Sequence, residues 1–257
     1  MPSATILLVR DGPGGLEVFM VQRHHRIDFA TGAMVFPGGK VEDGDRDPEI
    51  HGRCVGVEGL GQDAITVRVA AIRETFEESG VLLACPRGTG QLVNRERLRH
   101  IDAHFREELH EGRVGLRALL ESEDLELCCH HLVLFAHWIT PLFMPKRFDT
   151  HFFLVKAPAD QLALHDGREA VDSLWTTVDD ALADQRGGTR TIIFPTLAQL
   201  QKLGRSPTVA DALAAAQSAP IVTVLPRVKK AEDGTPILVL PADAGYDIVE
   251  APVDNVG

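Results

Sequence analysis

The sequence predicts one mixed α/β domain rather than two separate domains. Its 257 residues suffice for one well-buried domain with extensions, and 44% hydrophobic with 25% charged residues is ordinary for a globular protein. Short apolar runs of strand type alternate along the chain with amphipathic helical stretches. No low-complexity linker divides these elements, so we expect them to share one core.

The N-terminal segment predicts a β-hairpin followed by a third strand. Residues 6–9 form a short apolar run, residues 11–15 carry turn signals, and residues 16–21 resume with partly alternating apolar positions. Another apolar run, 33–36, ends at the sequence Pro-Gly-Gly of residues 37–39. We expect a strand to meet a sharp loop there.

The next stretch predicts a surface excursion and then a long helix. Residues 46–62 are polar and contain four glycines and one proline, so we expect them at the surface. From residue 64 to residue 79, apolar side chains recur at spacings of four, three and four, which is one face of an amphipathic helix. Gly80 suits the end of this helix, and the apolar run 81–83 predicts the next strand.

The remaining chain alternates helical and strand patterns. Residues 91–122 are highly charged and predict two helices that are broken near Gly112. The tail from residue 220 is rich in Val, Pro and Leu, and we expect it to add strands at the edge of the sheet. Apolar runs and helical periodicity predict three strands, 132–140, 149–156 and 171–176, and two helices, 192–203 and 209–217.

The composition excludes several classes of partner. A formal net charge of −11 repels nucleic acid unless basic residues cluster, and no apolar run reaches the roughly 20 residues that span a bilayer. Residues 1–10 lack the basic region of a signal peptide, so we expect a cytoplasmic protein with no nucleic-acid or membrane partner. The four cysteines form no C-x-x-C pair, and we interpret them as reduced thiols.

A cluster of three glutamates on the predicted helix carries the chemistry. Glu74, Glu77 and Glu78 fall at i, i+3 and i+4, so their carboxylates project from one face. Mg²⁺ and Mn²⁺ prefer such oxygen ligands, and Arg73 could clamp a carboxylate or a substrate phosphate bidentately. A solvated acidic helix face is the alternative interpretation. The upstream glycine loop favours the metal site, because it could bring backbone N–H groups close to an anion or to the helix.

These residues resemble the Nudix box, G-x5-E-x7-R-E-U-x-E-E-x-G-U, in which U is a bulky apolar residue. Residues 73–81 match its helical half, and Gly39 takes the place of its first glycine. Asp45 stands where the first glutamate is expected, and Thr75 fills the first U position. Residues 46–72 occupy a spacing that the box fills with seven residues, and a surface loop absorbs such an insertion at modest entropic cost.

The insertion resembles the split-box branch of Nudix hydrolases related to the peroxisomal coenzyme A diphosphatase. Residues 71–83 (AIRETFEESGVLL) and 137–141 (HWITP) are similar to that branch, and the resemblance covers roughly residues 4–200. It implies a Nudix-type α/β/α sandwich with a mixed sheet, a long insertion inside the box at about 46–63 and an added helical segment at about 91–122. We expect the domain to cover 1–205, with 206–257 as a C-terminal extension packed on it.

The resemblance implies a metal-dependent pyrophosphatase, and in this family a homodimer is common. Arg73 would act in catalysis by positioning carboxylates. Glu74 is one candidate for orienting or deprotonating the attacking water, and Glu123 and Glu169 are others. Mg²⁺ or Mn²⁺ would be held by Glu74, Glu77 and Glu78.

A second pattern concerns the substrate. Some coenzyme A-cleaving members carry an arginine, a second arginine five residues later, a glycine four further on and then x3-F-P-G-G. Arg23 and Gly32 fit these spacings, but Asp28 stands at the second arginine, and Arg26 is the substitute. A basic strand end without a ligand is an equal alternative. For coenzyme A or acyl-coenzyme A, the residues expected to bind substrate are Arg23, Arg26, Phe36, Gly38 and Gly39.

Three further interpretations are weighed against this one. The substrate could instead be ADP-ribose or NADH, or the chain could be a non-catalytic sensor of a nucleotide metabolite. Sensors of that kind often lose the box glutamates, whereas this chain keeps all three. Zinc binding at residues 128–131 (Cys-Cys-His-His) is disfavoured, because consecutive strand residues point to opposite faces.

Overall fold

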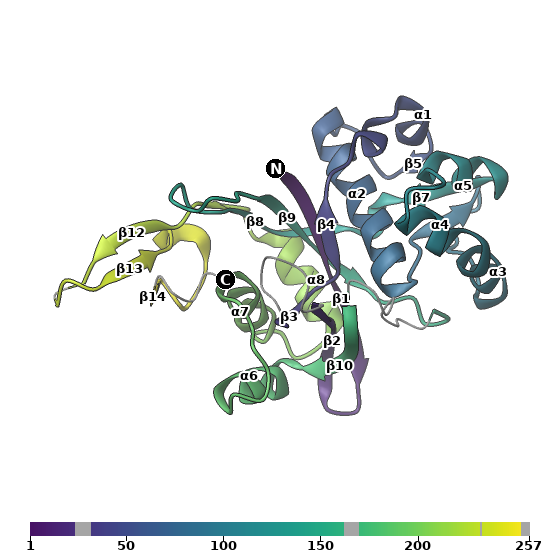
Figure 1. The fold of residues 1–257 in the computed structure, drawn as a ribbon. Helices are drawn as coiled ribbons and strands as arrows, with labels where there is room; N and C mark the ends of the chain where they lie inside the picture. The colour runs from purple at the N-terminus through teal and green to yellow at the C-terminus, as the bar shows by residue number, and fades with distance from the viewer. Residues whose placement is uncertain (24–31, 162–169, 232, 253–257) are drawn as a thin grey trace.

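The computed structural model describes residues 1–23, 32–161, 170–231 and 233–252, and a mixed sheet of eight strands forms its centre (Figure 1). Six strands follow the order β10-β2-β1-β9-β8-β11, while β3 pairs with β2 and β4 pairs with β1. The pairs β1–β9 and β8–β11 are parallel, and the other pairs are antiparallel. The strands are β1 (Pro2–Gly12), β2 (Gly15–Arg23), β3 (Met34–Val35), β4 (Gly38–Lys40), β8 (Val133–Ile139), β9 (Asp149–Lys156), β10 (Ala170–Thr177) and β11 (Thr223–Val224).

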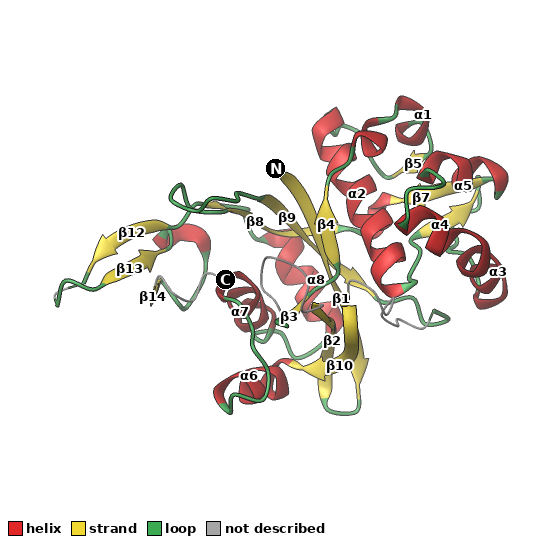
Figure 2. Ribbon diagram, viewed as in Figure 1, coloured by secondary structure: helices red, strands yellow, loops and turns green. Residues whose placement is uncertain are grey.

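Alternating side chains along β1 produce two hydrophobic cores, one on each face of the sheet. Ile6 and Leu8 join the core beneath α2, whereas Leu7 and Val9 join the core beneath α7 and α8. Figure 2 shows these helices on the two sides of the sheet. The predicted α/β/α sandwich with a mixed sheet is therefore confirmed. The helices of these outer layers are α2 (Gln62–Ser79), α6 (Val178–Arg186), α7 (Phe194–Leu203) and α8 (Val209–Ser218).

The long predicted helix is α2, and its apolar face packs on the sheet as expected. Val69, Ile72 and Phe76 are fully buried in the core that also holds Ile6. The helix ends where predicted, because Gly80 adopts a left-handed conformation at φ 71° and donates its N–H to the carbonyl of Phe76 at 2.9 Å.

The insertion before α2 is more ordered than the predicted surface excursion. It contains α1 (Pro48–His51) and β5 (Cys54–Val55), and the side chain of Ile50 is buried in the core beneath α2. The rest of residues 46–62 is exposed or half-buried, as expected for a surface excursion, and one buried side chain among many polar ones gives no periodic signal. The strand expected at 81–83 also begins later, at Ala84. A second sheet has the order β5-β7-β6, with β6 (Ala84–Pro86) and β7 (Leu125–Cys128).

The charged segment forms two helical stretches separated near Gly112, as predicted. Gly112 has φ 66°, a conformation that breaks the helix at the expected place. A π-helical turn, Asp102–Arg106, continues the first stretch. The helices are α3 (Arg95–Ile101), α4 (Glu107–His110) and α5 (Leu116–Ser122).

The C-terminal tail adds one strand to the main sheet and forms a sheet of its own. β11 pairs with β8 at the sheet edge, as expected for the tail. The remaining strands form the order β12-β13-β14, drawn in yellow in Figure 1. Tyr246 ties this region to β8, because its hydroxyl accepts a hydrogen bond from Trp138 Nε1 at 2.8 Å. The strands are β12 (Arg227–Lys230), β13 (Pro236–Val239) and β14 (Glu250–Pro252).

Two further observations complete the comparison with the predicted elements. Strands β8, β9 and β10 and helices α7 and α8 fall where the patterns predict them, whereas α6 has no counterpart among the predicted helices. Within the described ranges, no helix is long and apolar enough to cross a membrane.

The buried Gln161 holds the segment between α2 and β6, and this yields a stability prediction. Its amide accepts from the N–H of Leu82 at 3.0 Å and donates to the Leu82 carbonyl at 3.1 Å. Gln161→Met leaves both buried backbone groups unpaired, so we expect a loss of about 2–4 kcal/mol in the free energy of unfolding. Urea unfolding measures it. The exposed Gln91→Met is the control, and equal stabilities of the two variants would contradict this role.

Candidate active site

A buried ion pair joins the start of the insertion to helix α2. The Arg73 side chain donates from Nε to Asp45 Oδ1 at 2.9 Å and from Nη2 to Asp45 Oδ2 at 3.0 Å. Arg73 is 5% exposed and Asp45 1%, so both charges are shielded from water. The second oxygen of Asp45 also accepts the N–H of Glu42 at 2.8 Å. The residue that departs from the box pattern is thus the bidentate partner of Arg73.

Arg73 also contacts two of the three box glutamates. Its Nη1 donates to Glu77 Oε2 at 3.2 Å, and its Nη2 lies 3.1 Å from Glu74 Oε1. Burial alone would lower the pKa of Arg73, but the hydrogen bond to Asp45 and the surrounding carboxylates raise it above its usual value. The guanidinium therefore stays charged and holds these carboxylates in place.

The carboxylate of Glu77 lies in a negatively charged environment. Burial raises its pKa above the usual range, against the lowering effect of Arg73, and the charge of Glu42 adds to the rise. Arg73 forms ion pairs with the carboxylates of Asp45, Glu74 and Glu77, and Lys40 lines the same end of the cavity. A further cation at this place would lower the electrostatic energy of the cluster.

The predicted glycine loop is in fact a short strand that reaches the carboxylates. Gly38 and Gly39 pair with β1 as part of β4, which corrects the expectation of a loop. The N–H of Gly38 donates to Glu78 Oε2 at 2.8 Å. A Cβ on Gly38 would clash with the Ala4 carbonyl, and a Cβ on Gly39 would clash with the Glu74 carboxylate. Gly38 is needed because its backbone passes so close to β1, whereas a side chain at position 39 would displace the flexible Glu74 carboxylate.

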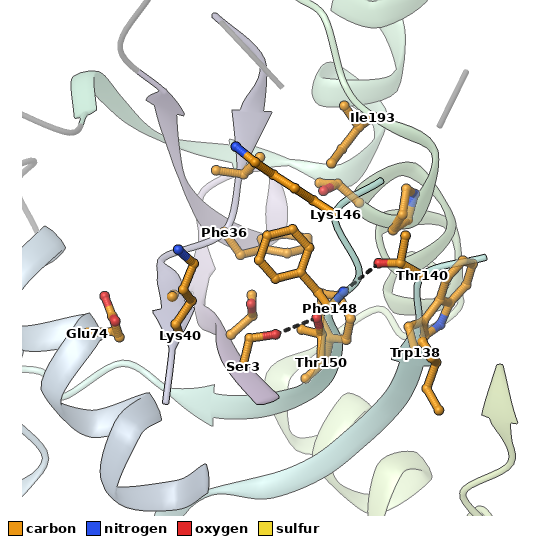
Figure 3. Close-up of a pocket in the computed structure, with 18 of the residues that line it drawn as sticks. Ser3, Phe36, Lys40, Glu74, Trp138, Thr140, Lys146, Phe148, Thr150 and Ile193 are labelled. Carbon is orange, nitrogen blue, oxygen red and sulfur yellow. Dashed lines mark hydrogen bonds between the residues drawn. The ribbon is translucent and has the colours of Figure 1, made fainter. Parts of the chain in front are cut away.

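The carboxylate cluster forms one end of a cavity of about 610 Å³. In Figure 3, Glu74 lies at one end, Trp138 at the other, and Lys40 and Phe148 between them. The far end is apolar and aromatic. Its lining side chains include those of Phe36, Trp138, Phe148, Phe152, Ile193, Phe194 and Leu238.

Hydrogen bonds fix the loop that carries Phe148 against the cavity. Thr140 donates its N–H to the Phe148 carbonyl at 2.9 Å, and its hydroxyl accepts the Phe148 N–H at 3.0 Å. Ser3 and Thr150 share a hydrogen bond of 2.7 Å between their hydroxyls on the adjoining strands (Figure 3). The wall opposite the carboxylates is therefore built by paired backbone and does not depend on side-chain packing alone.

The charged helical segment also contributes to the site. His110 at the end of α4 lines the cavity, and Arg106 donates from Nε to the Glu77 carbonyl at 2.9 Å. The last turns of this segment therefore border the cavity. Its earlier turns carry exposed residues.

Some of the predicted site residues meet at the cavity, and others do not. Arg73, Glu74, Glu77 and Glu78 come together at the cavity with Phe36, Gly38 and Gly39. Glu123 is not among the lining residues and instead lies 3.6 Å from Arg97. Arg23 ends β2, and neither its side chain nor any part of Arg26 or Glu169 is within the described residues.

Several lining residues were not predicted from the sequence. Lys40, Lys146 and Phe148 reach the cavity from β4 and from the stretch between β8 and β9. Isolated lysines and one aromatic residue in a connecting segment have no spacing that marks them. Trp138 is both buried and part of the cavity wall.

Comparison with known proteins gives one matching family. The model of the NUDT19 Nudix domain matches residues 56–203. The chain is 25% identical over 227 residues to the acyl-coenzyme A diphosphatase NUDT19 of Xenopus laevis, covering 73% of this chain and 59% of that protein. For the protein of the same name from Homo sapiens, identity is 24% over 216 residues, covering 65% and 55%. The chain thus spans less than two thirds of the length of these relatives.

One solved structure is similar over most of the chain. The crystal structure of a NUDIX hydrolase from Alicyclobacillus acidocaldarius superposes with a TM-score of 0.70 at 28% identity. The match covers 83% of this chain and 95% of that one. The likeness therefore includes the main sheet and its helical layers.

The buried pair yields a prediction about stability. In Asp45→Asn an amide NH₂ replaces one acceptor of the Arg73 guanidinium, and the charge is lost. We expect the free energy of unfolding to fall by about 1.5–3 kcal/mol. Asp43→Asn, an exposed change in the same 3-10 turn, is the control. Urea denaturation of both variants measures this effect. An Asp45→Asn protein as stable as the control would show that the ion pair contributes nothing to the free energy of unfolding.

Proposed function

The chain belongs to the NUDT19 Nudix domain family, and from this premise we propose that it is a divalent-metal-dependent pyrophosphatase. It would cleave a diphosphate bond in a nucleoside diphosphate derivative. The observation that supports this most is the cluster of Glu74, Glu77 and Glu78 around the buried Arg73, at one end of a large cavity.

The donor set of this cluster fits a hard divalent cation. Glu74, Glu77 and Glu78 offer carboxylate oxygens, the ligands that Mg²⁺ and Mn²⁺ prefer. Burial raises the pKa of Glu77, and a cation bound beside it would favour its charged form. When bound, such an ion neutralises the diphosphate and activates a water molecule.

The chain's own residues would act around that centre in separate ways. Arg73 is a positioning residue, because Asp45 and Glu77 occupy its hydrogen bonds. Gly38 fixes Glu78 through its N–H, and the bare Gly39 backbone leaves room for Glu74. Glu74 is our candidate for orienting or deprotonating the attacking water.

For the substrate we propose coenzyme A or an acyl-coenzyme A. Two curated relatives carry the name acyl-coenzyme A diphosphatase. The cavity has a carboxylate end for a metal-bound diphosphate and an aromatic end that suits the apolar acyl chain of an acyl-coenzyme A. Binding of the 3′-phosphate of coenzyme A by Arg23 and Arg26 stays a prediction.

The reaction is tested with isosteric variants of the box. We expect the purified chain with Mg²⁺ or Mn²⁺ to release 3′,5′-ADP from coenzyme A. Glu77→Gln and Glu78→Gln should each lower kcat by about 10²- to 10³-fold, since each removes a metal ligand's charge. Glu58→Gln, an exposed change, is the control. Quantitative chromatography of the products measures all four proteins.

A substrate panel separates the remaining alternatives. Coenzyme A, acyl-coenzyme A, ADP-ribose and NADH are compared under the same conditions. Turnover of ADP-ribose or NADH without turnover of coenzyme A would overturn the substrate and keep the enzyme class. Nucleotide binding with no turnover of any of the four would establish the sensor instead.

Lys146 gives a prediction about substrate binding. Its ammonium points into the cavity beside Phe148 (Figure 3), where it can contact a substrate phosphate. Lys146→Met should raise KM by about 10-fold or more with little change in kcat, because such a contact is equal in ground state and transition state. Lys156→Met, at the exposed end of β9, is the control. Steady-state kinetics with coenzyme A measure the effect, and an unchanged KM would remove Lys146 from the binding site.

A further inference from the structure

Two histidines and an aspartate gather on the face of the main sheet that is turned away from the cavity. His137 lies on β8, opposite His151 in the β8–β9 register, and Asp149 is two residues before His151. Side chains alternate along β9, so Asp149 and His151 share a face with Phe153, which belongs to the core beneath α2. Thr150 and Phe152, on the other face, line the cavity.

The ligand atoms of the three residues are close together. One atom from each lies within 4.8 Å of the other two, and all three residues are half-buried. The imidazole rings of His137 and His151 stack with centroids 4.1 Å apart. Among the described residues, only these form a group of three or more potential metal ligands by this distance.

Hydrogen bonding leaves this cluster incomplete without a further group. His137 Nε2 lies 2.5 Å from Asp149 Oδ1, whereas the buried Nδ1 of His151 has no hydrogen-bond partner. A buried polar atom without a partner is uncommon and costs stability.

A third strand orients one of the histidines. Thr223 Oγ1 on β11 lies 2.8 Å from His137 Nδ1. If the proton of His137 is on Nδ1, this N–H donates a hydrogen bond to Thr223 Oγ1. Nε2 then keeps a lone pair that points toward Asp149. This is the usual arrangement of a metal-bound histidine, whose other nitrogen is fixed by an outer partner.

We propose that His137, Asp149 and His151 bind a divalent transition-metal ion of the zinc class, with water completing its coordination. Two imidazoles and one carboxylate suit such an ion, whereas Mg²⁺ prefers oxygen ligands only. Tetrahedral ligands at about 2.0 Å from zinc lie roughly 3.3 Å apart, so the most widely separated ligand atoms have to close by about 1.5 Å at most. His137 Nε2 and Asp149 Oδ1, which lie 2.5 Å apart, have to separate by about 0.8 Å. Rotation about side-chain bonds covers both distances.

The site would be structural and separate from the carboxylate cluster. It joins β8 and β9, and Thr223 extends the connection to β11. Trp138 and Thr150 alternate with the metal ligands along these strands and line the cavity. A bound ion would therefore stabilise β8 and β9, which form part of the cavity wall, from the sheet face opposite the cavity. The proposal does not depend on the proposed reaction.

Zn²⁺ binding by the full chain tests the proposal. The Glu77→Gln/Glu78→Gln protein is stripped with chelator and titrated with Zn²⁺ in excess Mg²⁺, which keeps the carboxylate cluster from contributing. We expect about one equivalent to bind and the Tm to rise. Both effects should be lost in His137→Ala and in His151→Ala added to this background. His100→Ala and His104→Ala, in another stacked histidine pair, should bind Zn²⁺ unchanged.

Two more conservative variants test the proposal if the alanine substitutions disturb folding. Thr223→Val preserves shape and should weaken Zn²⁺ binding by about 10- to 100-fold, as expected for an outer partner. Asp149→Asn should also weaken it. Absence of stoichiometric Zn²⁺ binding overturns the proposal, and so does equal affinity in Asp149→Asn and its parent. Cleavage of coenzyme A is not measured here, so its failure leaves this result unaffected.

Discussion

The buried contact between Arg73 and Asp45 is the constraint on which the site depends. It connects two segments that an insertion separates in sequence, and both charges are nearly inaccessible to water. Removing two charges from water offsets most of their attraction, so such a pair adds little net stability over an apolar contact. Breaking it leaves a buried charge unpaired, which is strongly unfavourable. The pair therefore selects one arrangement of helix α2 against β4 and the start of the insertion.

The cavity arises because β1 changes its antiparallel partner along its length. Residues Ser3–Thr5 pair with β4, whereas Val9–Gly12 pair with β2, and β9 runs parallel to β1 on the other side. β4 and β2 pair with different parts of β1 and diverge from each other, so the sheet opens between them. Ser3 and Thr5 face the cavity there. β4 in turn carries Gly38 to Glu78, so the same divergence that opens the cavity also delivers a backbone donor to the carboxylates.

The sequence predicts a helix or strand best where its apolar periodicity and a residue typical of its end agree. Helix α2 has both an apolar period and the left-handed Gly80, and its start and end are found nearly where expected. Ile50 shows the opposite case, because a single buried side chain in a polar insertion has no period. Lys146 and Phe148 could not be predicted either. They come to the site through two hydrogen bonds between Thr140 and Phe148, one between backbone groups and one to the Thr140 hydroxyl, and such a single pair leaves no pattern in the sequence.

Alternation along β8 and β9 keeps the proposed metal ligands out of the cavity. Trp138 and Thr150 face the cavity, while His137 and His151 face the other way. The box carboxylates line the cavity, whereas the proposed site joins two imidazoles to the Asp149 carboxylate, and these two donor sets prefer different divalent ions. A one-residue slip between the strands would exchange the faces of every side chain. The long parallel pairing of β9 with β1, from Pro2 to Val9, opposes that slip and so protects both arrangements at once.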